Sequence, residues 1–236
     1  MPTRDATESH WPPLRAVLFD LDGTLLDTAP DLAGALNYLR ERHHLSPLDA
    51  LDIRPAASHG SVALIKLGFG LNEGDQDFEP LRQALLAHYR DRIAEATRPF
   101  MGVIEVIAHL RNRGLLWGIV TNKPGWLTTP LLAQVDLGAL PECVVAGDTL
   151  ATTKPDPAPL LHAAKMLGVA ATECVYIGDA ERDITAGNRA GMRTLVALYG
   201  YLDASDAPHT WGSSDTLQAP LDLIQWLDRQ SARGDT

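Results

Sequence analysis

The chain has 236 residues, of which 45% are hydrophobic and 21% are charged, so it can bury a substantial core and is not an intrinsically disordered chain. Lys and Arg number 20 and Asp and Glu number 30, a formal net charge of −10 that argues against non-specific binding of nucleic acid or of anionic lipid. An anionic small substrate would therefore have to meet a local positive site or a bound cation.

Two features of the sequence bear on the compartment. Cys143 and Cys174 are far apart and form no C-x-x-C motif, which is typical of a reducing compartment. The polar start of the chain, residues 1–13, lacks the apolar run of a signal peptide, and no segment approaches the roughly 18 consecutive apolar residues of a membrane span. We therefore expect a cytoplasmic protein, monomeric or homodimeric, with no membrane and no nucleic acid among its partners.

Short, continuous apolar runs that end in polar residues predict strands buried on both faces of a parallel sheet. These runs are 16–19, 115–121, 143–146, 174–177 and 194–198. Segments with helical periodicity lie between or after them, at 103–113, 160–167 and 220–233. The alternation of strands and helices predicts an α/β fold, specifically a doubly wound parallel sheet.

Residues 28–98 break this alternation and contain no convincing strand. Segments with helical periodicity lie at 32–39, 62–67 and 81–93, separated by turn signals at Ser46-Pro47, Arg54-Pro55 and Asn72-Glu73-Gly74. We therefore expect an α/β core formed by residues 14–27 and 99–236, with a helical domain of residues 28–98 inserted after the first strand.

The most specific motif is Asp20-Leu21-Asp22-Gly23-Thr24, directly after the first predicted strand. Residues two apart on an extended segment face the same way, so Asp20 and Asp22 should converge at the carboxyl end of that strand, where open α/β sheets bind ligands. Two close carboxylates need a counter-charge, and a hard divalent cation such as Mg2+ supplies it beside phosphate. A carboxylate can also act as a nucleophile and form an aspartyl-phosphate. The alternative is a pair of solvated turn aspartates.

A second pair of aspartates follows the predicted strand at 174–177. Asp179 would reach the same sheet edge as Asp20 and complete a cation site. Asp183 would be a further ligand or would orient one. The alternative for one of these two aspartates is an N-cap role on the helix that follows.

Polar residues that suit phosphate stand at two further places. The segment Thr121-Asn122-Lys123 follows the strand at 115–121 and offers a hydroxyl and backbone N–H groups to a phosphate oxygen. Lys154, just before a predicted helix start at Asp156-Pro157, would neutralise phosphate or hold the nucleophile in position. Taken alone, a lysine in such a place is usually solvated.

Together, these motifs resemble in their order those of the haloacid dehalogenase-type hydrolases, and the resemblance covers nearly the whole chain. It implies a Rossmann-like core with an inserted helical cap. It also implies that Asp20 is the nucleophile and Asp22 the general acid/base. The Mg2+ ligands that it implies are Asp20, the backbone carbonyl of Asp22, and Asp179, with Asp183 in support. The phosphate-binding residues that it implies are Thr121 and Lys154. We expect Asn122 to join them, because it directly follows Thr121 at the end of the strand.

The aspartate at position 22 bears on the reaction type. A departing alkoxide needs a proton and a halide does not, so Asp22 favours cleavage of a phosphate ester. We therefore expect a Mg2+-dependent phosphatase that acts on a small phosphorylated metabolite. The alternatives are a phosphomutase on the same fold and a catalytically silent binding or regulatory protein.

Within the family, the chain resembles the phosphoglycolate phosphatase group. The segments 115–124, Tyr199-Gly200-Tyr201 and Trp211-Gly212 are most similar to N-acetylmuramic acid 6-phosphate phosphatases, which belong to cell-wall recycling. The expected substrates are N-acetylmuramic acid 6-phosphate and 2-phosphoglycolate.

Three other features are open to two interpretations. The segment 54–60 resembles the cap loop that sets substrate choice in related enzymes, or it is an ordinary turn between helices. Arg182 either assists with phosphate or is solvated, and we expect it to be solvated. Tyr199 and Tyr201 line the pocket or pack under a loop, and we expect packing.

Overall fold

The computed structural model describes residues 11–234, so the expectation for the polar segment 1–13 falls largely outside the described residues. Its centre is a six-stranded sheet in which all neighbouring strands are parallel, in the order β5-β4-β1-β6-β7-β8. The strands are β1 Ala16–Phe19, β4 Leu116–Val120, β5 Cys143–Val145, β6 Cys174–Gly178, β7 Arg193–Ala197 and β8 Asp215–Leu217. The predicted doubly wound parallel sheet is confirmed.

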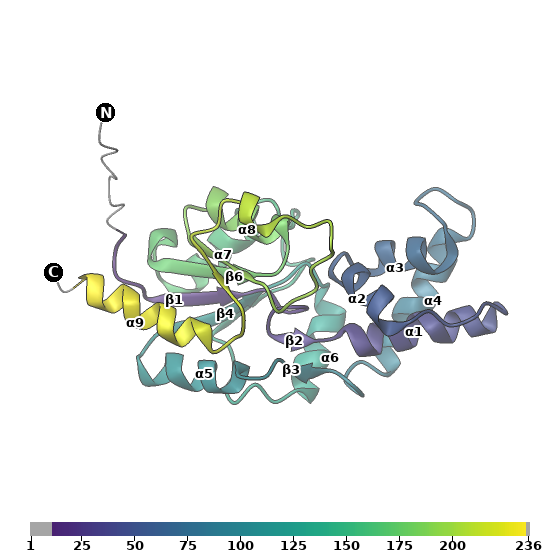
Figure 1. Ribbon diagram of the computed structural model, residues 1–236, viewed down its shortest axis with the longest axis horizontal. Helices are drawn as coiled ribbons and strands as arrows, with labels where there is room; N and C mark the ends of the chain where they lie inside the picture. The colour runs from purple at the N-terminus through teal and green to yellow at the C-terminus, as the bar shows by residue number, and fades with distance from the viewer. Residues whose placement is uncertain (1–10, 235–236) are drawn as a thin grey trace.

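Helices cover both faces of the sheet. On one side lie α5 Val103–Asn112, α6 Gly125–Gln134 and α9 Asp222–Gly234, and on the other lie α7 Ala158–Leu167 and α8 Glu181–Arg189 (Figure 1). Along β1, Val17 and Phe19 point into the first layer, and Ala16 and Leu18 point into the second. Both faces are buried, which explains why this strand is a continuous apolar run.

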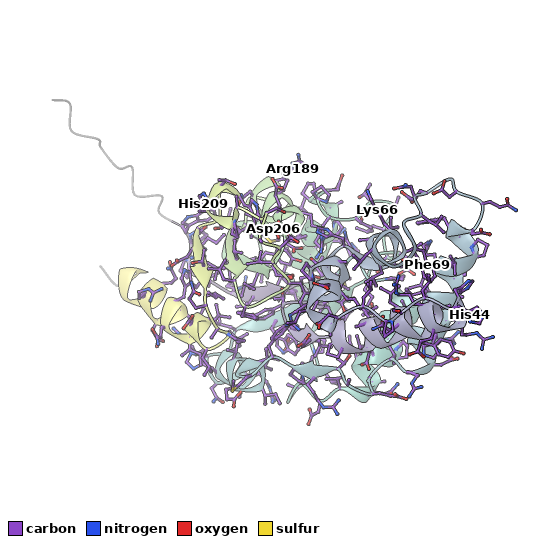
Figure 2. All side chains as sticks on the ribbon, turned by 45° about the vertical axis from the view of Figure 1, so that its right-hand side comes forward. His44, Lys66, Phe69, Arg189, Asp206 and His209 are labelled. Atoms are coloured by element: carbon purple, nitrogen blue, oxygen red, sulfur yellow. The ribbon has the colours of Figure 1, made fainter. Side chains whose placement is uncertain are left out.

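Four helices stand between β1 and the rest of the core along the chain. They are α1 Ala29–Arg42, α2 Ala50–Ser58, α3 Gly60–Phe69 and α4 Phe78–Asp91. Helix α1 packs against the other three, and together they extend beyond one end of the sheet (Figure 1). His44, Lys66 and Phe69 lie in this helical part, away from Arg189 and His209 of the core (Figure 2). We call this part the cap; the predicted domain boundaries at 27/28 and 98/99 stay a prediction.

The cap leaves and rejoins the core at one place. The short strands β2 Leu26–Asp27 and β3 Arg98–Pro99 pair antiparallel, so the outgoing and returning chains run side by side. Asp31, in the first turn of α1, accepts hydrogen bonds from the backbone N–H groups of Ala96 and Thr97 at 2.9 and 2.8 Å. These contacts fix the start of the cap beside its end.

Some elements differ from the prediction. Arg54-Pro55 was expected to be a turn, but it lies inside α2, whose start is capped by the Asp49 carboxylate accepting the Leu51 N–H at 2.8 Å. Pro55 has no backbone N–H to donate, but the loss of this one hydrogen bond does not end the helix. Helix α6 was not predicted, because Pro130 lies within it and argues against a helix in the sequence. Strand β8 was not predicted, because it begins with the exposed residues Asp215 and Thr216.

Two short 3-10 helices, Ala171–Glu173 and Pro208–Thr210, precede β6 and β8. Within residues 11–234, the helices are all too short or too polar to cross a membrane.

Candidate active site

Three predicted aspartates come together at the carboxyl ends of two neighbouring strands. Asp20 follows β1, Asp179 follows β6, and Asp183 lies in the first turn of α8. Each offers a carboxylate oxygen such that these atoms lie within 4.8 Å of one another, and all three residues are buried. The pairing of β1 with β6 produces this meeting, because Phe19 stands opposite Ile177 at the strand ends. The expected gathering of distant acidic residues is present.

Lys154 lies among these carboxylates and is itself buried. Its Nζ is 2.9 Å from an oxygen of Asp20 and 2.7 Å from an oxygen of Asp183. It also donates to the hydroxyl of Tyr176 at 2.8 Å, and that hydroxyl donates to the backbone carbonyl of Val120. The three N–H groups of the ammonium therefore have three acceptors. The alternative of a solvated Lys154 is excluded.

The charges of the cluster are only partly balanced, which the carboxyl pKa values reflect. Burial raises the pKa of Asp20, although Lys154 acts in the opposite direction. Burial, with repulsion from Asp183 and Asp20, raises the pKa of Asp179 to about 7. Burial acts in the same sense on Asp183, but Lys154 and Arg182 hold its pKa below the usual range. Asp179 is thus the carboxylate whose negative charge is least balanced, because Lys154 pairs with Asp20 and Asp183 instead.

The chemistry of this cluster fits a hard divalent cation. Its ligand atoms are carboxylate oxygens that lie within 4.8 Å of one another, and the single ammonium pairs with two of the three acidic groups. A cation there would supply the charge that Asp179 lacks.

Backbone and hydroxyl groups hold the Asp179 carboxylate in place. One oxygen accepts the N–H of Tyr201 at 2.9 Å, and the other accepts the Thr24 hydroxyl at 3.3 Å. Gly23 lies against it with φ of +81°, and a Cβ at this position would lie 2.7 Å from Cγ of Asp179. Only glycine fits both the turn and the close approach.

Asp22 lies beside the cluster and faces the cap. Its carboxylate accepts the hydroxyl of Thr28 at 2.6 Å and pairs with Nζ of Lys123 at 3.1 Å. Lys123 also donates to the hydroxyl of Tyr89, on cap helix α4, at 3.0 Å. Burial acts to lower the pKa of Lys123, but Asp22 and Tyr89 raise it overall.

Lys123 belongs to a motif that the sequence singles out, but no role was predicted for it. Its position directly after Asn122 at a strand end was the signal that could have placed it in the site. Tyr176 gave no such signal, because it is one apolar position within a buried strand.

The loop after β4 supplies two more predicted residues. Thr121 is buried, and its hydroxyl oxygen accepts the N–H of Lys123 at 3.1 Å. The side-chain amide of Asn122 donates to the Lys154 carbonyl at 2.9 Å and accepts the Lys154 N–H at 3.0 Å. Asn122 therefore supports the backbone of Lys154, while its contact with phosphate stays a prediction.

Arg182 and Tyr201 tie the core to the cap. Arg182 was expected to be solvated, but it is half-buried and donates from Nη2 to the carbonyl of Ser58 at 2.8 Å, so that expectation is wrong. The hydroxyl of Tyr201 accepts the N–H groups of Thr28 and Ala29, at the start of α1, at 2.6 and 2.9 Å. The expected packing of Tyr201 is confirmed.

The sequence matches the family described as haloacid dehalogenase-like hydrolase over residues 17–197. This match spans more than half of the chain and includes every predicted site residue. The chain belongs to the haloacid dehalogenase-like hydrolases. The resemblance stated from the sequence motifs is confirmed.

Similar proteins agree with this assignment. The chain is 40% identical to the N-acetylmuramic acid 6-phosphate phosphatase of Pseudomonas aeruginosa, covering 92% of this chain and 96% of that protein. It is 41% identical to the phosphoglycolate phosphatase of Xanthomonas campestris, covering 89% and 94%. Its fold is similar to that of a predicted phosphoglycolate phosphatase from Haemophilus somnus, with a TM-score of 0.80, 22% identity, and coverage of 90% and 97%. The predicted enzyme type, a phosphatase of this family, is confirmed.

Proposed function

We propose that this phosphatase is Mg2+-dependent and hydrolyses a small-metabolite phosphomonoester through an aspartyl-phosphate on Asp20. The observation that carries the proposal is the meeting of Asp20, Lys154 and Asp179 at one sheet edge, with Asp22 two residues beyond Asp20. A nucleophile, a cation for the phosphate and a set of hard oxygen ligands are then all within one small volume.

In this mechanism the carboxylate of Asp20 attacks phosphorus in line with the leaving oxygen. Asp22 protonates the departing alkoxide, and it later takes a proton from the water that hydrolyses the phospho-aspartate. The hydroxyl of Thr121 and the ammonium of Lys154 bind phosphate oxygens, and Lys154 exchanges one of its three acceptors in the protein for the phosphate.

The cation would be held by Asp20, the backbone carbonyl of Asp22, and Asp179, with Asp183 keeping Lys154 oriented. When bound, Mg2+ screens the negative charges of carboxylate and phosphate from each other. The cap excludes bulk water and contacts the alcohol portion of the substrate.

The best candidate substrates are N-acetylmuramic acid 6-phosphate and 2-phosphoglycolate. The names of two similar proteins support this choice. The first substrate would place the enzyme in the recycling of cell-wall sugars. A cytoplasmic location is consistent with Cys143 and Cys174, which are both free and buried.

The test is a side-by-side measurement of kcat/KM for these two substrates with purified protein and Mg2+, following free phosphate. We expect phosphate release from at least one, and none with Asp20→Asn. Isomerised sugar phosphate in place of free phosphate would favour the phosphomutase. If a broad metabolite panel gave no phosphate, the proposal would be wrong and a silent binding protein would be favoured.

A further inference from the structure

The cations around the candidate active site differ in whether a carboxylate already neutralises them. Lys154 pairs with Asp20 and Asp183, and Lys123 pairs with Asp22. Arg54, on α2, pairs with Asp27 at 2.9 Å, and its guanidinium lies 4.7 Å from the ring centre of Tyr201. Arg182 is the exception: among the described residues, no carboxylate lies within salt-bridge distance of its guanidinium.

Arg182 occupies the boundary between the acidic cluster and the cap. It lies in the first turn of α8, one residue before Asp183. Its Nη2 donates to the carbonyl of Ser58 at 2.8 Å and lies 3.3 Å from the Ser58 hydroxyl. Within residues 11–234, Nε and Nη1 form no hydrogen bond, so most donors of this guanidinium are unused.

Arg182 nevertheless interacts electrostatically with the three aspartates of the cluster. A guanidinium is charged at any ordinary pH, and although burial acts to lower the pKa of Arg182, the neighbouring Asp183, Asp20 and Asp179 raise it overall. A divalent cation together with Lys154 would balance the three carboxylates of the cluster. The charge of Arg182 would then have no carboxylate partner among residues 11–234, which leaves it available to an anionic group of a ligand.

We propose that Arg182 binds a carboxylate carried by the substrate, so that the enzyme selects phosphomonoesters whose alcohol portion is an acid. This inference rests on the proposed function and names the substrate class of the same site. A guanidinium presents a planar set of N–H donors that matches a carboxylate, and such charge-assisted bonds are strong.

The cap helps to place this guanidinium. Ser58 ends α2, and the segment Ser58-His59-Gly60 joins α2 to α3, so one donor of Arg182 is fixed by the cap and the others are left for a ligand. Both candidate substrates fit this requirement, because muramic acid carries a lactyl carboxylate and glycolate is itself a carboxylate. The acid would be recognised at the boundary, and the phosphate at the sheet edge.

The experiment compares matched substrates that differ in the carboxylate. N-acetylmuramic acid 6-phosphate is paired with N-acetylglucosamine 6-phosphate, which lacks the lactyl group, and 2-phosphoglycolate is paired with ethyl phosphate. We expect wild-type kcat/KM to be at least about tenfold higher for the acid of the preferred pair. Arg182→Gln should reduce kcat/KM for that acid by about ten- to a hundredfold and for its partner by less than about threefold.

The control variant is Arg189→Gln. Arg189 is on the same helix and is exposed at the outer edge of the core (Figure 2). Its single side-chain hydrogen bond among the described residues is to the carbonyl of Pro155, at 3.3 Å. Arg189→Gln removes the same charge and should leave kcat/KM unchanged for the acid and for its matched partner. Arg182→Lys keeps the charge but loses the planar set of donors, so we expect a smaller loss that is again confined to the acid.

Two results would overturn the inference. One is a wild-type enzyme that hydrolyses both members of each pair equally well, and the other is an Arg182→Gln variant that loses the same factor on both, which is what a merely structural contact with Ser58 would produce. These outcomes leave the phosphatase proposal intact. If the wild-type protein releases no phosphate from the four compounds and none from a broad metabolite panel, both the proposed function and this inference are wrong.

Discussion

Asp20, Asp179 and Asp183 occupy one buried volume with a single ammonium, an arrangement that works against the stability of the ion-free fold. Their gathering could be predicted, because Asp20 and Asp179 each follow a strand whose apolar run marks it as buried, and Asp183 comes four residues after Asp179. Their partners could not. The bonds from Lys154 to Tyr176 and from Lys123 to Tyr89 join side chains far apart in the sequence, and no local pattern encodes them.

Asp20→Asn should abolish turnover, because an amide cannot replace the carboxylate as a nucleophile. We expect kcat to fall by at least about a thousandfold, the loss associated with removing a covalent catalyst. Phosphate release measures kcat, and circular dichroism checks that the fold is kept. Retained turnover would remove Asp20 from the role of nucleophile.

Asp179→Asn should stabilise the ion-free protein at pH 8. The pKa of Asp179 is raised to about 7 from 3.8, chiefly by burial and then by neighbouring carboxylates, so the folded state favours the protonated form. The stability from this group is complete below about pH 4 and is lost as the pH rises through about 7. Asparagine does not ionise, so the free energy of unfolding at pH 8 should rise, by up to about 4 kcal/mol.

Urea titrations of wild-type and Asp179→Asn protein in EDTA, at pH 5 and at pH 8, would measure this difference. Addition of Mg2+ should reverse the order, because the variant lacks a ligand. A variant that is less stable than wild-type protein at both pH values in EDTA would contradict the prediction.

The turn between β1 and β2 fits closely against Asp179, which follows β6. Gly23→Ala places a Cβ against the Asp179 carboxylate at a residue with φ of +81°. We expect loss of at least about 1 kcal/mol of stability and a large fall in kcat/KM. Thermal unfolding and phosphate release measure the two effects.

Gly34→Ala is the matched control for that change. Gly34 is inside α1 and exposed. Within residues 11–234, no atom outside the neighbouring part of its own helix lies within 4 Å of the place that an added methyl group would take. Alanine is the better helix former by about 0.5–1 kcal/mol, so this variant should be more stable and equally active. A similar loss in both variants would show that the close approach of Gly23 to Asp179 does not matter.

The elements that could be predicted are those whose burial leaves a strong pattern. Strand β1 is apolar at every position because helices cover both sides of it. The pair of β2 and β3 has two residues in each strand, too few for any periodicity. Strand β8 begins with exposed Asp215 and Thr216, and the proline in α2 suggested a turn where a capped helix exists.

The cap and the core share one hydrophobic cluster. Leu36 and Ile53 of the cap belong to the same cluster as Phe19 and Trp117 of the core. We therefore expect the cap and the core to unfold together in one cooperative transition.

Two probes can test this cooperativity. All 5 tryptophans lie outside residues 28–98, so tryptophan fluorescence follows the core, while far-ultraviolet circular dichroism also follows the cap helices. The two signals should give the same midpoint in urea. A change in circular dichroism that precedes the fluorescence change would mean that the cap unfolds alone.

The antiparallel contact between β2 and β3 has an evolutionary consequence. Because Leu26 stands opposite Pro99, the roughly seventy residues between them form an insertion whose two ends are neighbours. An ancestral gene could lose, gain or exchange such an insertion by recombination without moving the candidate catalytic residues of the core. The inserted helices and the core can then change as separate inheritable traits.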